Sequence, residues 1–304
     1  MSLLKDLIAC PKVEAHNHLN LGMRYSSYVK WAGFYIPNFP RRLKGLDEMH
    51  EAVIIPYTRP RVKTYEDVES VFSLSIESAI QDNVKILEGS CDIQFVEQCG
   101  GVDKFTSLVQ KLSARYSDKI DFRPEIGVGK TFDREKIKMW LDLLLDSNTF
   151  KSIDLYGPEV ENRLDFFVPY YKKAENLGIK KKAHVGEFSE ASSIVRMVNL
   201  LGLDEVQHGD TCVFSKDVIK FLAQNKIRCN LCPESNFVLG AVKSIKDHPI
   251  RQMVEEGISV TVNTDDLLLF NRSISEQCMD LVENGLFSAE EMIKILKDSY
   301  EKSL

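Results

Sequence analysis

Short runs of apolar, β-favouring residues alternate with longer amphipathic segments along the whole chain. The longer segments, for example 65–82 and 133–147, repeat apolar residues at i, i+3, i+4 and i+7, which predicts helices with one buried face. Several of them end in a glycine directly before the next apolar run, as helices that stop ahead of a strand often do. The predicted strands are residues 12–19, 84–91, 120–128, 150–157, 179–187, 204–209, 227–235 and 258–266.

The alternation of strand and helix predicts an α/β protein with a parallel sheet. Eight such units in 304 residues favour a closed (β/α)8 barrel, the TIM barrel, over the alternative of an open doubly wound sheet. No Pro/Gly/Ser-rich linker and no internal repeat divides the chain. We therefore expect residues 1–304 to form one domain.

The segment from Gly22 to about Arg61 does not follow this alternation of short strands and helices. It is too long for a simple connection, and it carries aromatic residues and prolines. We interpret it as a long, partly helical excursion after the first strand. In a barrel, excursions at the C-terminal face of the strands often cover the active site.

Composition narrows the class of protein. With 44% hydrophobic and 28% charged residues, the chain has the makeup of a globular protein with a sizeable core. Its net charge of −6 argues against nucleic acid or an anionic membrane as the main partner. No apolar run is long enough for a membrane span, and Lys5 and Asp6 interrupt the stretch that a signal peptide would need, so we expect a cytoplasmic protein. The seven scattered cysteines fit reduced thiols better than a disulfide framework.

In a barrel, chemistry gathers at the C-terminal ends of the strands. Four of the six histidines fall there together with acidic residues, whereas His50 and His248 lie elsewhere and are expected to be surface or capping residues. One such histidine alone could be a core residue with a satisfied hydrogen bond, but four at equivalent strand ends indicate a shared site. The residues at the predicted strand ends are His16, His18, His184, Glu187, His208, Asp265 and Asp266.

The first of these strands suggests what the site holds. His16 and His18 are two residues apart, so on a strand both imidazoles point to the same face. Imidazoles that converge with a carboxylate suit Zn²⁺, Fe²⁺ or a similar cation. The C-x-x-C pair of Cys229 and Cys232 is a weaker metal signal, because no second pair follows it, and we interpret it as core packing.

Taken together, six motifs resemble the adenosine deaminase family of the amidohydrolase superfamily, and their order and spacing match from about residue 12 to 270. The motifs are "HNHL", "IDLYGPE", "HVGE", "QHG", "CPESN" and "NTDD". The resemblance implies a (β/α)8 barrel that binds one zinc ion per chain. The superfamily also contains two-metal members, and the resemblance suggests that these use a modified lysine at the end of strand four. Here that strand reads "SIDLYG" and has no lysine at its end, which favours a single metal. The implied ligands are His16, His18, His184 and Asp265.

The resemblance also implies roles around a purine substrate. Glu187 would protonate the ring nitrogen N1, and His208 would hold and orient the metal-bound water, so these two residues and the ligand Asp265 would be catalytic. Asp266 would contact N7, and Gly157 would donate its backbone N–H to N3. These roles suit the chemistry, because adding water to an aromatic amidine carbon needs an activated water and a proton for the ring.

Departures from the family pattern fall at the sugar end of the pocket. Asn20 stands where the family has an acid that contacts the ribose 5′-hydroxyl, and Leu267 stands where proline usually follows the acidic pair. The leading hypothesis is therefore deamination of adenosine to inosine and ammonia. The alternatives are deamination of adenine or a 5′-modified adenosine, another hydrolysis on the same metal site, or a non-catalytic barrel that binds nucleosides or partners.

Overall fold

The computed structural model describes residues 3–159 and 164–304, and its centre is a single parallel sheet. Eight strands follow one another in the sheet in chain order, and the short β3 (Asp121–Phe122) pairs with β2 beside this path. The eight are β1 (Lys12–His18), β2 (Val84–Asp92), β4 (Glu125–Gly129), β5 (Ser152–Tyr156), β6 (Lys180–Val185), β7 (Glu205–His208), β8 (Arg228–Leu231) and β9 (Val260–Val262).

The last strand returns to the first, so the sheet closes on itself. Beyond β9, Asp265 and Asn17 form a parallel bridge. The Asp265 N–H donates to the His16 carbonyl oxygen at 3.0 Å, and the His18 N–H donates to the Asp265 carbonyl oxygen at 3.4 Å. The predicted (β/α)8 barrel is confirmed, and the open sheet is not what forms.

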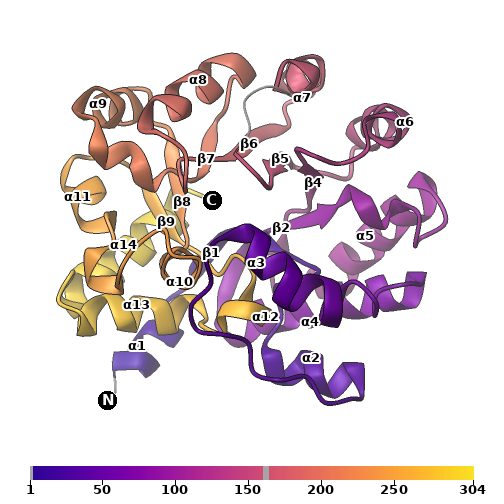
Figure 1. Cartoon of the computed structure of the whole chain (residues 1–304), viewed down its shortest axis with the longest axis horizontal. Helices are drawn as coiled ribbons and strands as arrows, with labels where there is room; N and C mark the ends of the chain where they lie inside the picture. Colours follow the sequence, from indigo (N-terminus) through magenta and orange to yellow (C-terminus); the bar gives the residue numbers. More distant parts are fainter. Residues whose placement is uncertain (1–2, 160–163) are drawn as a thin grey trace.

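Helices surround the barrel, as Figure 1 shows. Short polar residues begin several of them by accepting backbone N–H groups: Thr64, Ser273 and Ser288 each take part in a capping box. The helices between and after the strands are α4 (Tyr65–Gln81), α5 (Val102–Tyr116), α6 (Arg134–Asp146), α7 (Val168–Asn176), α8 (Ala191–Leu201), α9 (Lys216–Gln224), α10 (Pro233–Val238), α11 (Ile250–Glu255), α12 (Leu267–Phe270), α13 (Ile274–Glu283) and α14 (Ala289–Glu301), with α1 (Leu3–Ala9) ahead of β1. Short 3₁₀ turns are η2 (Ile93–Val96), η3 (Leu164–Phe167), η4 (Asp210–Phe214) and η5 (Ile245–Asp247).

The excursion after β1 is partly helical, as predicted. It contains α2 (Tyr25–Ala32), α3 (Leu46–Met49) and the π-helix η1 (His50–Thr58). Figure 1 shows α3 on the side of the ring of strands where β1 and β2 lie. Side chains from α3 and η1 line the main cavity of the barrel, so the excursion covers the end of the barrel where the strands' carboxyl ends lie.

Several predicted strands are shorter in the structure, for local reasons. The predicted strand 120–128 is divided between β3 and β4 by Pro124, which has no N–H to give to a ladder. The predicted strand 227–235 ends at Leu231, because Pro233 begins α10. The last one ends at Val262, ahead of Asp265, whose φ of 56° is incompatible with an extended chain.

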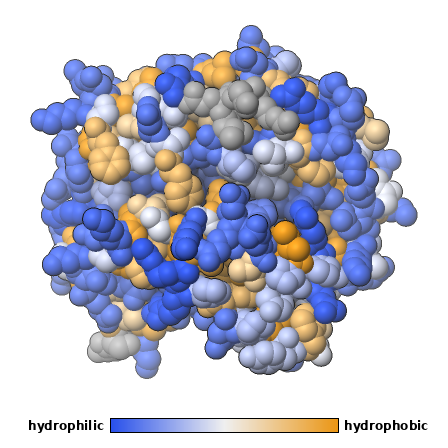
Figure 2. All heavy atoms as spheres, in the orientation of Figure 1, coloured by the Kyte–Doolittle hydropathy of each residue, from blue (hydrophilic) through white to orange (hydrophobic). Residues whose placement is uncertain are grey.

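The remaining expectations about the chain concern its surface and its thiols. No helix within residues 3–159 and 164–304 is long and apolar enough to cross a membrane. Hydrophilic residues cover most of the face in Figure 2, with hydrophobic ones scattered among them. All seven cysteines are free and buried.

Candidate active site

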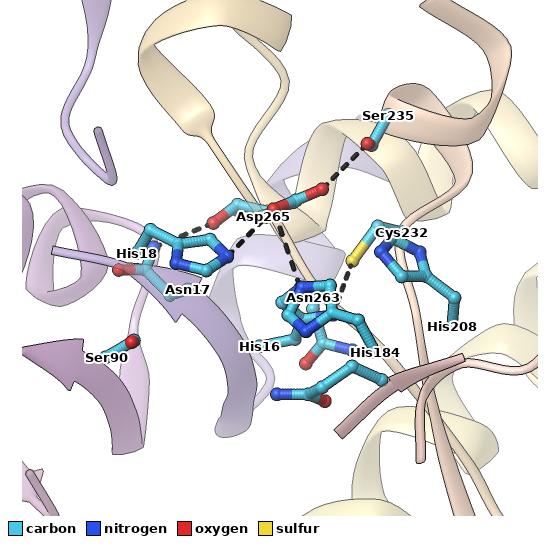
Figure 3. A network of polar contacts seen from close by, with 12 residues as sticks. His16, Asn17, His18, Ser90, His184, His208, Cys232, Ser235, Asn263 and Asp265 are labelled. Atoms are coloured by element: carbon cyan, nitrogen blue, oxygen red, sulfur yellow. Dashed lines mark hydrogen bonds and ion pairs between the residues drawn. The ribbon is translucent and has the colours of Figure 1, made fainter. Parts of the chain in front are cut away.

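Four of the predicted residues converge at the C-terminal end of the barrel (Figure 3). His16 and His18 come from β1, His184 comes from β6, and Asp265 follows β9. One possible ligand atom from each of them lies within 4.8 Å of the others, and all four residues are buried. The two β1 histidines point the same way, as their spacing predicts.

Polar neighbours orient these three imidazoles. In each ring Nδ1 faces an acceptor, so Nδ1 carries the proton and Nε2 keeps its lone pair for the centre of the cluster. The acceptors are Asp154 Oδ2 for His184 (3.1 Å), the Asn230 carbonyl oxygen for His16 (3.3 Å) and Asp92 Oδ1 for His18 (3.8 Å). The sequence analysis gave none of these three partners a role.

The cluster fits a divalent metal ion. Nε2 of His16 lies 2.9 Å from Nε2 of His184, and two lone pairs at that distance repel each other unless a shared proton or a metal cation lies between the groups. Nε2 of His16 and of His18 also lie 3.5 and 3.6 Å from the same oxygen, Oδ1 of Asp265. Three imidazole nitrogens and one carboxylate oxygen are a donor set that zinc accepts.

A second group of possible ligands shares His16 and adds His208 and Cys232. The Cys232 Sγ lies 3.3 Å from His16 Nδ1, so this cysteine borders the site, although the sequence analysis assigned it to core packing only. Burial raises the pKa of its thiol well above the usual value, which keeps it protonated and makes it a poor ligand. The first group is therefore the better metal site.

Asp265 and Asp266 both face the cavity although they are adjacent. The positive φ of Asp265 (56°) breaks the alternation of an extended chain, and Oδ2 of Asp265 accepts a hydrogen bond from Ser235 Oγ at 2.7 Å. Their pKa values move in opposite directions. Burial opposes ionisation of Asp265, but the nearby histidines lower its pKa overall. Burial and the charge of Asp265 raise the pKa of Asp266 well above its usual value.

Glu187 and His208 lie beside the metal-ligand cluster. Glu187 Oε2 is 3.5 Å from His208 Nε2, and both side chains are buried. Burial, followed by the charge of Asp265, raises the pKa of Glu187 well above its usual value. Burial and the neighbouring His16 lower the pKa of His208. A carboxyl that keeps its proton and a neutral imidazole are thus neighbours in this site.

The loop that carries Glu187 is held by another acid. The Glu159 carboxylate accepts hydrogen bonds from the backbone N–H groups of Glu187 (2.9 Å) and Phe188 (3.1 Å), and also from that of Ser189. Glu159 is the last residue of the "IDLYGPE" motif, but the sequence analysis gave it no role of its own.

The ends of β5 and β6 are joined by a buried lysine. Lys130 Nζ donates to the His184 carbonyl oxygen at 2.7 Å and reaches the Gly157 carbonyl oxygen at 3.4 Å. Gly157 has a φ of 91°, a conformation that favours glycine. The sequence analysis named Gly157 but not Lys130.

A cavity of about 480 Å³ opens over this cluster. Of the nine residues that the sequence analysis assigned to the site, eight line it, and the ninth, His16, contacts His184. Oδ1 of Asn20 and Oδ1 of Asp266 are buried without a hydrogen-bond partner among the described residues. The eight lining residues are His18, Asn20, Gly157, His184, Glu187, His208, Asp265 and Asp266.

The two histidines outside the predicted site differ from each other. His50 is exposed, as expected, and it lines the outer part of the cavity. His248 is buried rather than on the surface, but it has the capping role that was the other expectation: its ring accepts the N–H of Ile250 at the start of α11, and it also contacts polar residues next to the site. A single histidine in a loop gives no sequence signal of such burial.

The barrel carries a cluster of candidate metal ligands at the carboxyl ends of its strands, where barrel enzymes have their catalytic groups. The profile of the adenosine deaminase family matches residues 130–304. The chain is 45% identical over 279 residues to a Treponema pallidum (strain Nichols) protein named "Putative adenosine/adenine deaminase", a match that covers 91% of this chain and 93% of the relative. The chain therefore belongs to the adenosine deaminase family and is a hydrolase that acts on C–N bonds.

Solved structures share the fold at lower identity. The adenine deaminase from Arthrobacter aurescens is 21% identical with a TM-score of 0.72, and the match covers 97% of this chain and 99% of that one. An amidohydrolase from Burkholderia ambifaria with bound Zn is 19% identical with a TM-score of 0.78, and the match covers 100% of this chain and 88% of that one.

Proposed function

We propose that this enzyme hydrolytically deaminates a 6-aminopurine nucleoside, with adenosine as the leading substrate and one zinc ion per chain. The observation that carries the proposal is a single cavity that combines two different sets of groups. One set is the cluster of His16, His18, His184 and Asp265. The other is a pair of buried carboxyls with raised pKa values, Glu187 and Asp266.

His16, His18, His184 and Asp265 would hold the zinc. When bound, zinc lowers the pKa of water toward neutrality and so supplies a nucleophile at physiological pH. The backbone and carboxylate partners of the three imidazoles keep the Nε2 lone pairs aimed at the ion.

Glu187 is the proton donor in this proposal. In the reaction the water oxygen bonds to C6 and a proton goes to N1; the C6–N6 bond then breaks, and ammonia leaves with an added proton. The proton at N1 prevents negative charge from building up on the ring as its aromaticity is lost. Burial and the charge of Asp265 raise the pKa of Glu187, which supports this role because the donor must arrive protonated.

Asp266 and Gly157 would fix the purine. N7 of the ring is an acceptor, so a carboxyl can contact it only by donating, and the raised pKa of Asp266 supports that protonation state. Its Oδ1 is buried without a hydrogen-bond partner among the residues described. Gly157 would give its N–H to N3, which is also an acceptor. A 6-aminopurine offers acceptors at N1, N3 and N7, and in this proposal Glu187, Gly157 and Asp266 would each donate to one of them.

The choice of nucleoside over base or nucleotide rests on the outer part of the cavity. A volume of about 480 Å³ leaves room beyond a purine. Asn20 and Gln98 line the cavity, and Oδ1 of Asn20 and Oε1 of Gln98 are buried without hydrogen-bond partners among the described residues. These oxygens could accept hydrogen bonds from the hydroxyl groups of a sugar. The buried carboxylate of Asp92 also lines the cavity and disfavours a phosphate. Adenine is the second candidate, because the names of the Treponema relative and of the Arthrobacter enzyme include it.

The test is an ultraviolet assay of zinc-loaded enzyme with adenosine, adenine and AMP at equal concentrations, with ammonia release as an independent measure. We expect adenosine to have the highest kcat/KM and AMP the lowest. Turnover of adenine alone would shift the substrate to the free base. If none of the three were converted by protein that holds about one zinc per chain, 6-aminopurine deamination would be refuted, and other C–N substrates would be screened.

A further inference from the structure

We propose that His248 is a positioning residue for the chemical step, acting through Asn236 on His208 and Glu187. The inference rests on the proposed deaminase function and adds to it a buried chain of hydrogen bonds. The chain starts in the loop before α11 and ends on the proton donor and its neighbouring imidazole. All of its members are described residues with relative exposures of 7% or less.

The first link fixes the proton on His248. The Ile250 N–H donates to Nδ1 of His248 at 3.2 Å, so in the neutral ring the proton is on Nε2. That Nε2–H then donates to Oδ1 of Asn236 at 3.1 Å. The backbone of α11 thus determines the tautomer of an imidazole that faces the active site.

Asp210 strengthens this link from the other side. Its Oδ1 lies 3.1 Å from His248 Nε2. Both of its carboxylate oxygens are buried and have no hydrogen-bond partner elsewhere in the described chain. The negative charge therefore favours a proton on the nitrogen that faces Asn236. Asp210 follows His208 by two residues, so the network returns to the same strand end.

The second link is the amide of Asn236, which is fully buried. With Oδ1 fixed as the acceptor of the His248 proton, Nδ2 faces the catalytic groups. It lies 3.4 Å from Nδ1 of His208 and 3.5 Å from Oε1 of Glu187, and it donates to both. Without His248, the amide could turn over and place its oxygen against a carboxyl and an imidazole lone pair.

The third link is the tautomer of His208. Because Nδ1 accepts from Asn236, the proton of the neutral ring is on Nε2, the nitrogen that lies 3.5 Å from Glu187 Oε2. His208 thus presents an N–H donor to the cavity beside Oε2 of Glu187, while Oε1 of Glu187 accepts from Asn236. His248 touches neither the substrate nor the metal ligands in this arrangement, so it acts only through its neighbours.

The test compares His248→Leu with His248→Gln. The glutamine amide can supply an N–H where Nε2 of the histidine lies, whereas leucine fills the space without a donor. We expect His248→Leu to lower kcat by about 10- to 100-fold, as misplaced catalytic groups do, with KM changed less than about threefold. His248→Gln should recover most of kcat, and both variants should bind zinc as the wild type does.

A double-mutant cycle tests the route. If His248 acts through Asn236, then His248→Leu should cause no further loss of kcat in an Asn236→Leu background. Additive losses would show that His248 acts by another path and would overturn the proposal. So would equal losses in His248→Leu and His248→Gln, because a purely structural role does not depend on the donor.

A measurement that needs no substrate can test this proposal independently of the proposed function. Long-range ¹⁵N–¹H NMR of ¹⁵N-histidine-labelled enzyme reports which ring nitrogen of each of the six histidines is protonated. We expect His208 to be the Nε2–H tautomer in the wild type and in His248→Gln, and a mixture in His248→Leu. A wild-type His208 with its proton on Nδ1 would refute the proposal, even if His248→Leu did not fold and whatever the substrate is.

Discussion

The interior of the barrel holds two layers of charged residues that differ in how their charges are compensated. In the layer at the N-terminal half of the strands, three cations meet three carboxylates across the barrel. In the layer above it, imidazoles and carboxyls face a cavity. The lower layer consists of Lys180, Lys182 and Arg228 with Glu88, Glu125 and Glu205; the upper layer is the candidate active site.

In the lower layer, each charged side chain lies beside one of opposite charge. Lys182 is 2.6 Å from an oxygen of Glu88 and 2.8 Å from one of Glu125, and it donates to the carbonyl oxygen of Ala15. Despite burial, which lowers a lysine pKa, these carboxylates raise the pKa of Lys182. Every lysine, arginine and glutamate of this layer lies within ion-pair distance of an opposite charge, so the layer needs no ligand to balance its charges, and we interpret it as structural.

In the upper layer, groups of the same kind face each other. Two imidazole nitrogens face each other at 2.9 Å, and Asp266 and Asn20 keep buried oxygens without partners among the described residues. His208 and Asp265 also hold positive φ values of 66° and 56°. The comparison shows that one face of a strand can hold a structural ion pair and, two residues further along, a residue of the candidate active site. Lys182 and His184 on β6 are an example.

Removing a ligand from the upper layer should have the largest effect. We expect His18→Ala to lose both zinc and activity, because it removes one of the three imidazole donors of the candidate metal site. Zinc content measured by atomic absorption and turnover of adenosine check this. The fold should persist in circular dichroism, since the ion pairs below are untouched. A variant that keeps one zinc and near wild-type kcat would remove His18 from the ligand set.

Glu187→Gln tests the proton donor without disturbing the metal site. The amide cannot deliver a proton to N1, so kcat should fall by about 10²- to 10⁴-fold while zinc content stays the same. Thermal stability at neutral pH should be unchanged, because burial raises the pKa of Glu187 so that the carboxyl is already neutral in the folded protein, as the amide is. Retention of near wild-type kcat would exclude Glu187 as the acid.

Lys182→Met is the corresponding substitution in the lower layer and removes its most buried cation. It leaves Glu88 and Glu125 buried without their shared cation, and we expect unfolding free energy to fall by about 3–5 kcal/mol. Urea unfolding measures this, and kcat per zinc-loaded molecule should stay close to wild type. A loss of kcat as large as that of Glu187→Gln, with little change in stability, would show that the two layers are not separate.

The sequence predicted the upper layer far better than the lower one. Strand periodicity and the positions of His16, His184 and Asp265 indicated a shared site, because polar residues at strand ends have few structural explanations. Lys182 and Glu205 give no such signal, because charged residues within a short strand look exposed until closure of the barrel places them opposite each other. Long-range partners of this kind depend on the fold and cannot be seen in local spacing.

Stability at acid pH tests the ion pairs of Glu205 in the lower layer. Burial alone would raise the pKa of Glu205, but Arg228 and Lys180 lower it well below its usual 4.5. The unfolded chain therefore binds a proton near pH 4.5 that the folded chain does not, so this stabilisation is complete above about pH 4.5 and is lost as the pH falls below it. Glu205→Gln should lower stability by up to about 3 kcal/mol at pH 7, and the difference from wild type should narrow below pH 4.5. Unfolding midpoints from pH 3 to 8 check this, and a difference that is constant with pH would exclude the ion pair as its cause.

Asn20→Asp addresses the edge of the upper layer, where the expected effect is smallest. A carboxylate in place of the unpartnered amide oxygen would accept a charge-assisted hydrogen bond from a sugar hydroxyl. The ratio of kcat/KM for adenosine to that for adenine should rise by a factor that corresponds to about 1–3 kcal/mol, with the adenine value itself unchanged. Asn20→Ala is the control and should lower the same ratio, because it removes the acceptor altogether. If both variants kept the wild-type ratio, Asn20 would not contact the sugar, and the preference for a nucleoside would have to come from elsewhere in the cavity, with Gln98 as the next residue to change.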